Sequence, residues 1–249
     1  MAESKWKNHQ RTLIVCSRGV TQNQRHLIND LVKLLPHSKK EAKVDKVNQV
    51  EAIHDLAEMH NCNNFIYLES RRKIAFLWIG HLPEGPSAKF LLHSVHTSQE
   101  LKLSGNCLKG SRPLLSFDSS FQSSPHLALL KHMFTQTLSV PLYHPKSMPF
   151  FDHVFSITQS NNHIFFRNFE VVEQDQASMV EIGPRFVLTP IKIFEKALSG
   201  PTLYKNGAYK KPEKEPRVSR YQEKLTKKPK REPKVVIQTE DASFKDVYG

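Results

Sequence analysis

The chain has 249 residues, of which 39% are hydrophobic, and it carries a formal net charge of +12. This length and 15 phenylalanines allow a sizeable buried core. No apolar run approaches the roughly 18 residues of a membrane span and the first residues lack the apolar stretch of a signal peptide, so we expect a soluble protein that does not contact membranes and stays on the reducing side of the cell.

The three cysteines Cys16, Cys62 and Cys107 are far apart in the sequence and odd in number. This pattern indicates neither a disulfide framework nor a zinc cluster. Free cysteine usually behaves as a small buried hydrophobe, and we expect that role for all three.

The first elements form a strand followed by a helix. The run 11–18 has the length and β-branching of a buried strand, and Thr21 and Gln24 have the spacing of a capping box. The helix that follows is stopped by Pro36. Its apolar face consists of Leu27, Ile28, Leu31, Val32 and Leu35.

A basic connector, 37–46, leads to a second helix predicted from Val50 to about His60. Two apolar runs, "NFIYLES" and "KIAFLWIG", then predict a hairpin with Arg71 and Arg72 at its tip. Gly85-Pro86 introduces a further strand that runs to Val95.

The second part of the chain repeats this order. "RPLLSFDSSF" predicts a strand, and 125–138 predicts a helix with Ser124 as its cap and Pro125 in its first turn. Two apolar runs around "SNN" predict a hairpin, and Gly183-Pro184 precedes the last strand.

The two Gly-Pro pairs are 98 residues apart, a plausible size for a duplicated half-domain. We therefore predict an α/β (α+β) fold made of two similar half-modules, about 5–98 and 99–204, within one domain at 5–204. Glycine tolerates positive φ and proline fixes φ, so each pair is expected to turn the chain into the strand that completes its own sheet.

Residues 205–249 differ in composition from the rest. Between Lys205 and Lys234 there are 12 Lys or Arg against 4 Asp or Glu, with many prolines and almost no aliphatic side chains. Such a segment cannot repay its ordering entropy with a core of its own, so we expect an extended basic tail. "KLTKKPKREPK" also has the cation density of a nuclear import signal.

Two patterns resemble catalytic or metal-binding motifs. "GNCLKGSR" has the glycine spacing of a phosphate loop but lacks the lysine that reaches the β and γ phosphates, so it is either a glycine-hinged connector or a small basic loop that touches RNA phosphate. The 13 histidines are not spaced with a third and fourth zinc ligand. No nucleophile elbow occurs either, so we expect no catalytic residue, no metal and no cofactor.

Several long strings resemble the Brix-domain proteins of ribosome biogenesis, and among them factors of the large ribosomal subunit. The resemblance runs from about Trp6 to about Pro212 and is carried by "SRGV", "RHLINDLVKLLPHSKKE", "NCNN", "SAKFLLHSVHTSQELKLSGNCLKGSRPLLSFD", "HPKSMPFFDHVF" and "VEIGPRFVLTPIKIFE" with "GPTLY". It implies two α/β halves related to the anticodon-binding domain of some aminoacyl-tRNA synthetases. The short tail departs most from the family pattern.

The remaining functional signal is positive charge near predicted loops and helix ends, where phosphate contacts position a nucleic acid. Arg185 has an alternative role, because it could close its own turn by binding carbonyl groups. The phenylalanines lie mostly at strand positions and are interpreted as core residues rather than as platforms for base stacking. The candidate RNA-binding residues are Arg18, Arg25, Lys39, Lys40, Arg71, Arg72, Lys109, Arg112, Arg167, Arg185, Lys227, Lys228, Lys230 and Arg231.

Two functions remain open. The resemblance favours a non-enzymatic assembly factor that binds precursor ribosomal RNA in the nucleolus of the nucleus, together with ribosomal proteins and other large-subunit assembly factors. The alternative is a scaffold that recruits another assembly factor, a helical one by the resemblance, with RNA contact secondary.

The tail gives the first testable prediction. If about 4–6 of its cations neutralise phosphates of single-stranded RNA, deletion of 205–249 should flatten the slope of log affinity against log salt by roughly 3–4 units, because fewer counterions are released on binding. Thermal melting of the remaining domain should not change. An unchanged salt slope would exclude the tail from RNA binding and leave roles in import, in docking on a protein partner, or as an inert extension.

Overall fold

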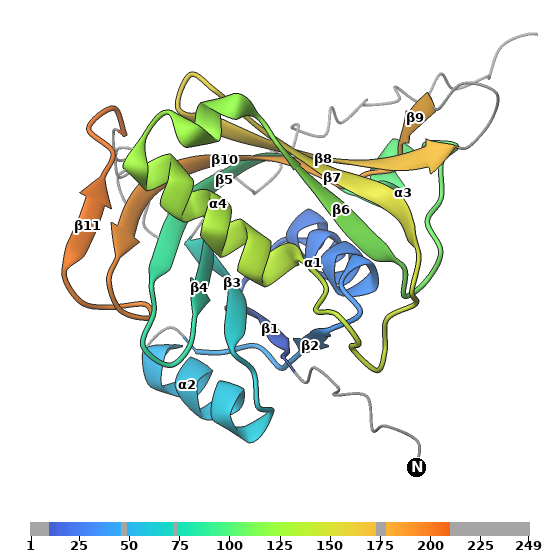
Figure 1. Cartoon of the computed structure of the whole chain (residues 1–249). Coiled ribbons are helices and arrows are strands. Elements are labelled where there is room, and N and C mark those ends of the chain that lie inside the picture. The colour runs from blue at the N-terminus through green and yellow to red at the C-terminus, as the bar shows by residue number, and fades with distance from the viewer. Residues whose placement is uncertain (1–9, 46–48, 72–73, 173–177, 210–249) are drawn as a thin grey trace, which may run out of the picture. The chain divides into compact units, whose positions relative to one another are not determined.

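The computed structural model describes residues 10–45, 49–71, 74–172 and 178–209, which lie in one compact unit, Met1–Tyr209. The first half of this unit contains two short parallel strands, two helices and a three-stranded meander (Figure 1). In chain order these are β1 (Thr12–Cys16), α1 (Gln22–Leu34), β2 (Ser38–Lys40), α2 (Gln49–Met59), β3 (Asn64–Arg71), β4 (Ile74–His81) and β5 (Ser87–His96).

The second half begins after the short helix α3 (Ser98–Leu101) and contains the same basic order with small additions. Its elements are β6 (Arg112–Phe117), the 3-10 helix η1 (Ser119–Gln122), α4 (Pro125–Leu138), β7 (Phe151–Ser160), β8 (His163–Val172), β9 (Ser178–Glu181), β10 (Arg185–Phe194) and β11 (Thr202–Lys205).

One sheet runs through both halves in the order β2-β1-β3-β4-β5-β10-β8-β7-β6. The series β1, β3, β4, β5 has the same pairing directions as the series β6, β7, β8, β10: the first pair is parallel and the next two are antiparallel. The α/β fold of two similar halves is therefore confirmed.

The expectation that each Gly-Pro strand completes a separate sheet is wrong in one respect. Each of β5 and β10 does complete its own half, but the two also pair with each other along most of their length, from Arg185 opposite His96 to Phe194 opposite Ser87. The halves consequently share a single continuous sheet.

Helices α1 and α4 pack into one apolar core on the same side of this sheet, and α4 reaches across to the first half. The carbonyl of Thr137 in its last turn accepts hydrogen bonds from Thr12 and His37, and that of Gln136 accepts one from Asn64. The ring of Phe134 also stacks on Phe90, with centroids 5.7 Å apart. A helix from the second half thus covers strands of the first.

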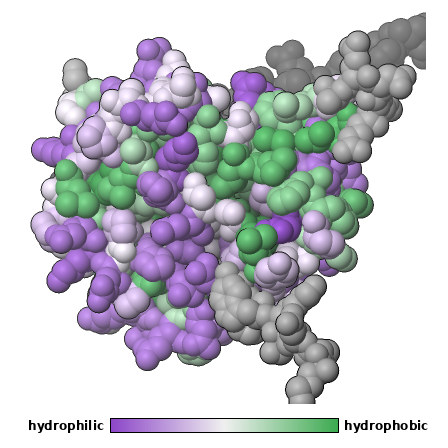
Figure 2. Space-filling model, viewed as in Figure 1, coloured by the Kyte–Doolittle hydropathy of each residue, from purple (hydrophilic) through white to green (hydrophobic). Residues whose placement is uncertain are grey.

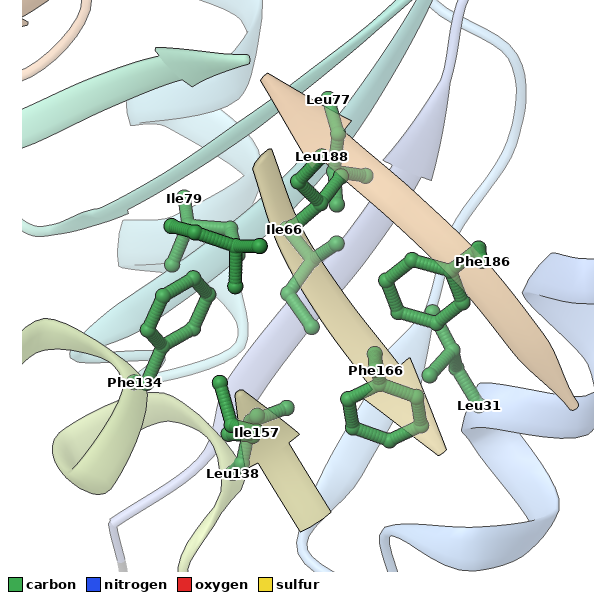
Figure 3. A pocket seen from close by; sticks show the side chains of 11 residues that line it. Leu31, Ile66, Leu77, Ile79, Phe134, Leu138, Ile157, Phe166, Phe186 and Leu188 are labelled. Atoms are coloured by element: carbon green, nitrogen blue, oxygen red, sulfur yellow. The ribbon is translucent and has the colours of Figure 1, made fainter. Parts of the chain in front are cut away.

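The centre of this core lies between the two halves (Figure 3). A residual void of about 20 Å³ is lined by side chains from α1, α4 and both parts of the sheet. Leu31 of α1 faces it together with Phe166 and Phe186 of the second half, whereas Phe134 of α4 faces it together with Ile79 of the first. Neither half could close this core with its own residues.

The opposite face of the first half carries a second core under α2. Ile53 and Ala57 of α2 are buried in it, together with Phe65, Tyr67 and Trp78 from β3 and β4. Figure 1 shows α2 separated from α1 and α4 by the strands.

Several local expectations are confirmed and others need correction. The capping box is formed, since Thr21 and Gln24 exchange hydrogen bonds. Ser124 does occupy the cap of α4, with Pro125 in the first turn, but its hydroxyl makes no capping hydrogen bond. The strand predicted to run to Phe121 ends at Phe117, where Asp118 instead leads into η1.

Each Gly-Pro corner contacts the chain that leaves the central strand of the other half. Gly85, with φ +103°, lies against the backbone of Glu195 and Lys196, just after β10. Gly183, with φ +80°, lies against Ser98 and Leu101, just after β5. Both Gly-Pro bonds are cis. The corners therefore belong to the contact between halves.

The two corners should differ in their tolerance of a methyl group. A Cβ on Gly85 would lie 2.7 Å from the Cα of Lys196 and closer still to the carbonyl oxygen of Glu195, so it would overlap backbone atoms. A Cβ on Gly183 would instead meet the end of the Leu101 side chain at 3.0 Å, and that side chain can rotate away.

We predict that Gly183→Ala destabilises the domain by about 1–3 kcal/mol, because alanine is strained at positive φ. Gly85→Ala should reduce the free energy of unfolding by a larger amount, since backbone atoms must move as well. Urea unfolding of the two variants measures the difference, and equal losses would contradict the contact described for Gly85.

Candidate nucleic-acid interface

Four candidate cations gather at the carboxyl ends of the first strands. Strands β2, β1 and β3 are parallel neighbours, so their carboxyl ends lie on one side of the sheet. Lys40 ends β2, Arg71 ends β3, Arg18 follows β1 by two residues, and Arg25 lies in the first turns of α1. We refer to Arg18, Arg25, Lys40 and Arg71 as the basic edge.

The thiol of Cys16 lies close to two cations of the basic edge, Lys40 and Arg25. Burial raises the pKa of the Cys16 thiol, and the positive charges of Lys43, Lys40 and Arg25 oppose that rise. Lys40 is anchored by a hydrogen bond of 2.6 Å from its ammonium group to the Asn29 side chain. Lys40, Lys43 and Arg25 come from separate segments and all lie close enough to Cys16 to affect its thiol.

Arg18 and Arg71 are exposed and each has one acidic partner. The Arg18 Nε lies 2.9 Å from Asp45, and both side chains are more than half exposed, so the pair is screened by water and its net contribution is small. Arg71 donates to the carboxylate of Glu69, which is fully buried. That buried anion fixes the direction of the Arg71 side chain.

Glu69 joins β3 to its neighbours through three donors. Its Oε2 accepts from Trp78 Nε1 at 3.1 Å and from Lys89 Nζ at 3.2 Å, and Lys89 also lies 4.5 Å from the centroids of Phe76 and Trp78. Burial alone would raise the pKa of Glu69, but the Trp78 hydrogen bond and the Lys89 and Arg71 charges outweigh it and leave that pKa below its ordinary value.

Arg167 and Arg185 form a second group of candidate RNA-binding cations, on β8 and β10. Phe166 and Phe186 are paired across β8 and β10, and the two arginines occupy the positions next to them on the same side of this pair. Arg167 is exposed, and Arg185 is half-buried with its Nε 3.6 Å from Glu181. No described contact joins Arg185 to the carbonyls of its turn, so ion pairing with Glu181 is its described structural role.

The loop 105–112 is held by acidic side chains. The amide of Asn106 donates to Glu170 at 2.9 Å, and the amide of Leu108 donates to Asp152 at 2.6 Å. These carboxylates take amides that a phosphate loop would direct at its ligand. The arrangement favours the connector interpretation for the loop backbone.

The two cations of this loop have different settings. Lys109 is exposed. Arg112 donates to the carbonyl of Val140 at 3.2 Å and lies 5.1 Å from the ring centroid of Phe151, so its guanidinium group has a packing role inside the protein. Arg112 is therefore a weaker RNA candidate than the sequence indicated.

Lys39 points away from the basic edge. Its ammonium lies 3.6 Å from Glu41, which also contacts His60 at 2.9 Å. Arg11 and Lys146, which sequence reasoning did not select, line one cavity with Lys39. The sequence offers one signal that these two segments are related: the strings "PHSK" and "HPKS" contain the same four residue types, and each comes after a helix.

Five candidate cations lie outside the described residues: Arg72, Lys227, Lys228, Lys230 and Arg231.

Metal ligation finds no support in the part of the chain that the structure describes, where no three His, Cys, Asp or Glu side chains gather around a common point. His93 and His163 instead share the hydroxyl of Thr189, at 2.9 and 2.8 Å. Within the same ranges, no helix has the length and hydrophobicity to cross a bilayer.

Comparison with known protein families gives a match to the Brix domain over residues 17–192. The sheet of two equivalent halves agrees with this match. The chain belongs to the Brix-domain family. The match begins directly after β1 and ends within β10, so it includes the basic edge and most of the shared sheet.

Curated relatives strengthen the assignment of the Brix domain. The chain is 52% identical over 221 residues to the ribosome biogenesis protein BRX1 homologs of Homo sapiens and Pongo abelii, which is 88% of this chain and 62% of those proteins. It is 45% identical over 209 residues to the Caenorhabditis elegans homolog, 83% of this chain and 59% of that protein. The chain thus spans about three fifths of the length of these relatives.

A solved structure has the same fold at low sequence identity. The crystal structure of a probable ribosomal biogenesis protein from Aeropyrum pernix K1 superposes with a TM-score of 0.51 at 15% identity, covering 72% of this chain and 96% of that one. The Brix fold is therefore retained although most side chains differ.

The Glu69 cluster provides a test of how the Brix domain supports Arg71. We predict that Glu69→Gln destabilises the domain by about 3–5 kcal/mol, because Lys89 is left without its carboxylate in a mostly buried site. Since the folded-state pKa of Glu69 is depressed, its contribution is present at neutral pH and is lost as the pH falls below about 4.

Urea unfolding at neutral pH measures this loss. Glu69→Gln combined with Lys89→Met should reduce the free energy of unfolding less than Glu69→Gln alone, since no unpaired charge remains. Arg71→Ala should change the stability of the domain little. A Glu69→Gln variant as stable as the original chain would contradict the role given to this ion pair.

Proposed function

We propose that this chain is a non-enzymatic assembly factor that binds precursor ribosomal RNA and helps to build the large ribosomal subunit in the nucleolus. Membership of the Brix-domain family and the names of the BRX1 relatives support a role in ribosome biogenesis. The basic edge is the observation that carries the RNA-binding part of the proposal.

The basic edge is suited to a phosphate backbone for a geometric reason. Its cations come from the ends of three neighbouring strands and from α1, so they are spread along one side of the sheet, and two of them are held by fixed partners, Asn29 and Glu69. Positioned Lys and Arg side chains neutralise phosphates without reading sequence. Sequence preference would then require the other groups or protein partners.

Within the described ranges, many of the strand phenylalanines are unavailable for base stacking. Most phenylalanines of the strands are buried, among them Phe65, Phe90, Phe155 and Phe166. This supports contacts through phosphates rather than stacked bases.

A second candidate function, a scaffold for another assembly factor, is supported by exposed apolar side chains around β6. Figure 2 shows apolar residues gathered over this strand. In β6, at the start of β7 and in the segment between α4 and β7, the apolar side chains more than 40% exposed are Leu114, Leu142, Tyr143, Met148, Phe150 and Phe151. Arg112 links them, since it contacts Phe151 and Val140 and its amide binds the carbonyl of Phe150. Such patches mark protein contact sites.

Matched charge removals test the RNA-binding role. In the full chain, Arg18→Gln, Arg25→Gln and Lys40→Gln together should flatten the slope of log affinity against log salt by about 2–3 units for a precursor ribosomal RNA fragment. The control removes three cations elsewhere, with Lys33→Gln, Lys131→Gln and Lys196→Gln, and should leave the slope closer to that of the original chain.

The salt series separates the two candidate functions. Equal slopes for the two triple variants would reject the basic edge as the RNA-binding surface. Unaltered RNA affinity in both, together with loss of a partner on Leu142→Ser and Phe151→Ser substitution, would favour the scaffold.

A further inference from the structure

A small cavity of about 60 Å³ lies where the segment after α1 meets the segment after α4. Its walls come from 36–39 in the first half, from 144–146 in the second, and from Arg11 just before β1. We call it the seam cavity. Two of its lining residues are prolines, Pro36 and Pro145, which stiffen the walls.

The seam cavity has a positively charged lining. Arg11, Lys39 and Lys146 border it, and none of the described residues that line it is acidic. The acid paired with this lining is Glu41, 3.6 Å from Lys39. Lys109 lies close to the rim, since the amide of Met148 binds the carbonyl of Gly110 and a Cβ on Gly110 would be 3.3 Å from the carbonyl of Lys146. The electrostatic field in this cavity therefore favours an anion.

Two buried polar atoms of the lining residues have no hydrogen-bond partner among the described protein atoms. They are Nδ1 of His37, whose residue is 2% exposed, and Oγ of Ser38. Polar groups buried in this way normally have a partner, which can be a protein group, a water molecule or a ligand, and both of these residues line the cavity.

The protonation of His37 is defined by its other nitrogen. Its Nε2 lies 3.2 Å from the carbonyl of Thr137, which can only accept, so Nε2 carries the proton. Burial, with a smaller effect from His144, lowers the pKa of His37 to about 4. At neutral pH, Nδ1 is therefore an acceptor that requires a proton from the ligand.

The volume limits the ligand to a small group. An atom the size of a water molecule requires about 10–15 Å³ of cavity volume, so the seam cavity holds about four to six such atoms. A phosphate group has about that many non-hydrogen atoms, whereas a nucleobase does not fit. A phosphodiester inside a strand has no proton to offer Nδ1 and needs two exits for its chain. A terminal phosphate has a titratable hydroxyl and needs one exit.

We propose that the seam cavity binds a terminal phosphate group, a phosphomonoester at the end of an RNA strand. One phosphate oxygen shares a proton with His37 Nδ1, another accepts from the Ser38 hydroxyl, and Arg11, Lys39 and Lys146 neutralise the charge. The choice of RNA as the source rests on the function proposed above, whereas the choice of phosphate rests on the cavity alone.

The test compares short single-stranded RNAs of one sequence with a phosphate at the 5′ end, at the 3′ end or at neither, each binding to the full chain. The preferred phosphorylated end should bind about tenfold more tightly than the hydroxyl-ended RNA. Inorganic phosphate should compete with the phosphorylated RNA only. Ser38→Ala with Lys146→Gln should reduce the preference to less than about twofold, and the control Lys33→Gln should keep it.

The pH dependence supplies an independent readout of His37. Because binding requires one proton between Nδ1 and the phosphate, the preference should fall by up to about tenfold per pH unit above about pH 6. The other titratable or charged groups that face His37 or border the cavity are His144, Arg11, Lys39 and Lys146, with the Glu41–His60 pair behind Lys39. The double variant, which retains these histidines, shows whether the pH effect belongs to the bound phosphate.

The outcomes separate this inference from the proposed function. Equal binding of all three RNAs, without competition by inorganic phosphate, would overturn the seam-cavity proposal and leave RNA binding through the basic edge intact. Failure of every RNA to bind, while inorganic phosphate raises the melting temperature of the original chain but not of the double variant, would reject the RNA-binding function and support the phosphate site.

Discussion

The structure depends on the antiparallel pairing of β5 with β10. These two strands are the last of the four equivalent strands in their halves, and their pairing turns two short sheets into one. Pro190 lies within β10, where proline has no amide proton to donate, but the register shifts between Pro190 and Lys192. The strand stays paired with β5 on both sides of this shift, and the Pro190 carbonyl accepts a hydrogen bond from the Asn206 side chain at 2.8 Å.

This pairing places α1 and α4 where each can cover strands of the other half. The apolar side chains around Leu31 and Phe134 meet in the middle of the molecule, and the void between them is no larger than about 20 Å³. Separation of the halves would expose both apolar faces of this closely packed core to water, at a cost in free energy. The Gly-Pro corners add to the same contact, since each lies against the chain leaving the other central strand.

Short-range patterns predicted most elements of the fold. The capping box at Thr21, the stop at Pro36 and the hairpin around "SNN" depend on neighbours in sequence, and the structure has an element boundary at each. The sequence did not reveal β2, β9 or β11, which have three or four residues each and owe their conformation to a neighbouring strand. The crossing of α4 to Thr12 and Asn64 is equally a long-range result that periodicity cannot show.

The candidate sites show the same division. Positive charge near the end of β1 was visible in the sequence, but only the parallel pairing of three strands shows that Lys40 and Arg71 lie at the same edge of the sheet as Arg18. Arg112 was selected for its charge, and only the structure shows that it packs on Phe151. His37 was not selected at all, because nothing in its local sequence indicates that one ring nitrogen is buried without a partner.

The shared sheet also has a consequence for synthesis of the chain. His96 and Phe194, the last residues of β5 and β10, are 98 residues apart in the sequence. At roughly 5–20 residues per second, translation of that interval takes about 5–20 s, during which β5 has no partner on one edge and the apolar face under α1 is uncovered. A nascent chain therefore spends this time with an unpaired strand edge, the state in which chaperones bind and misassembly begins.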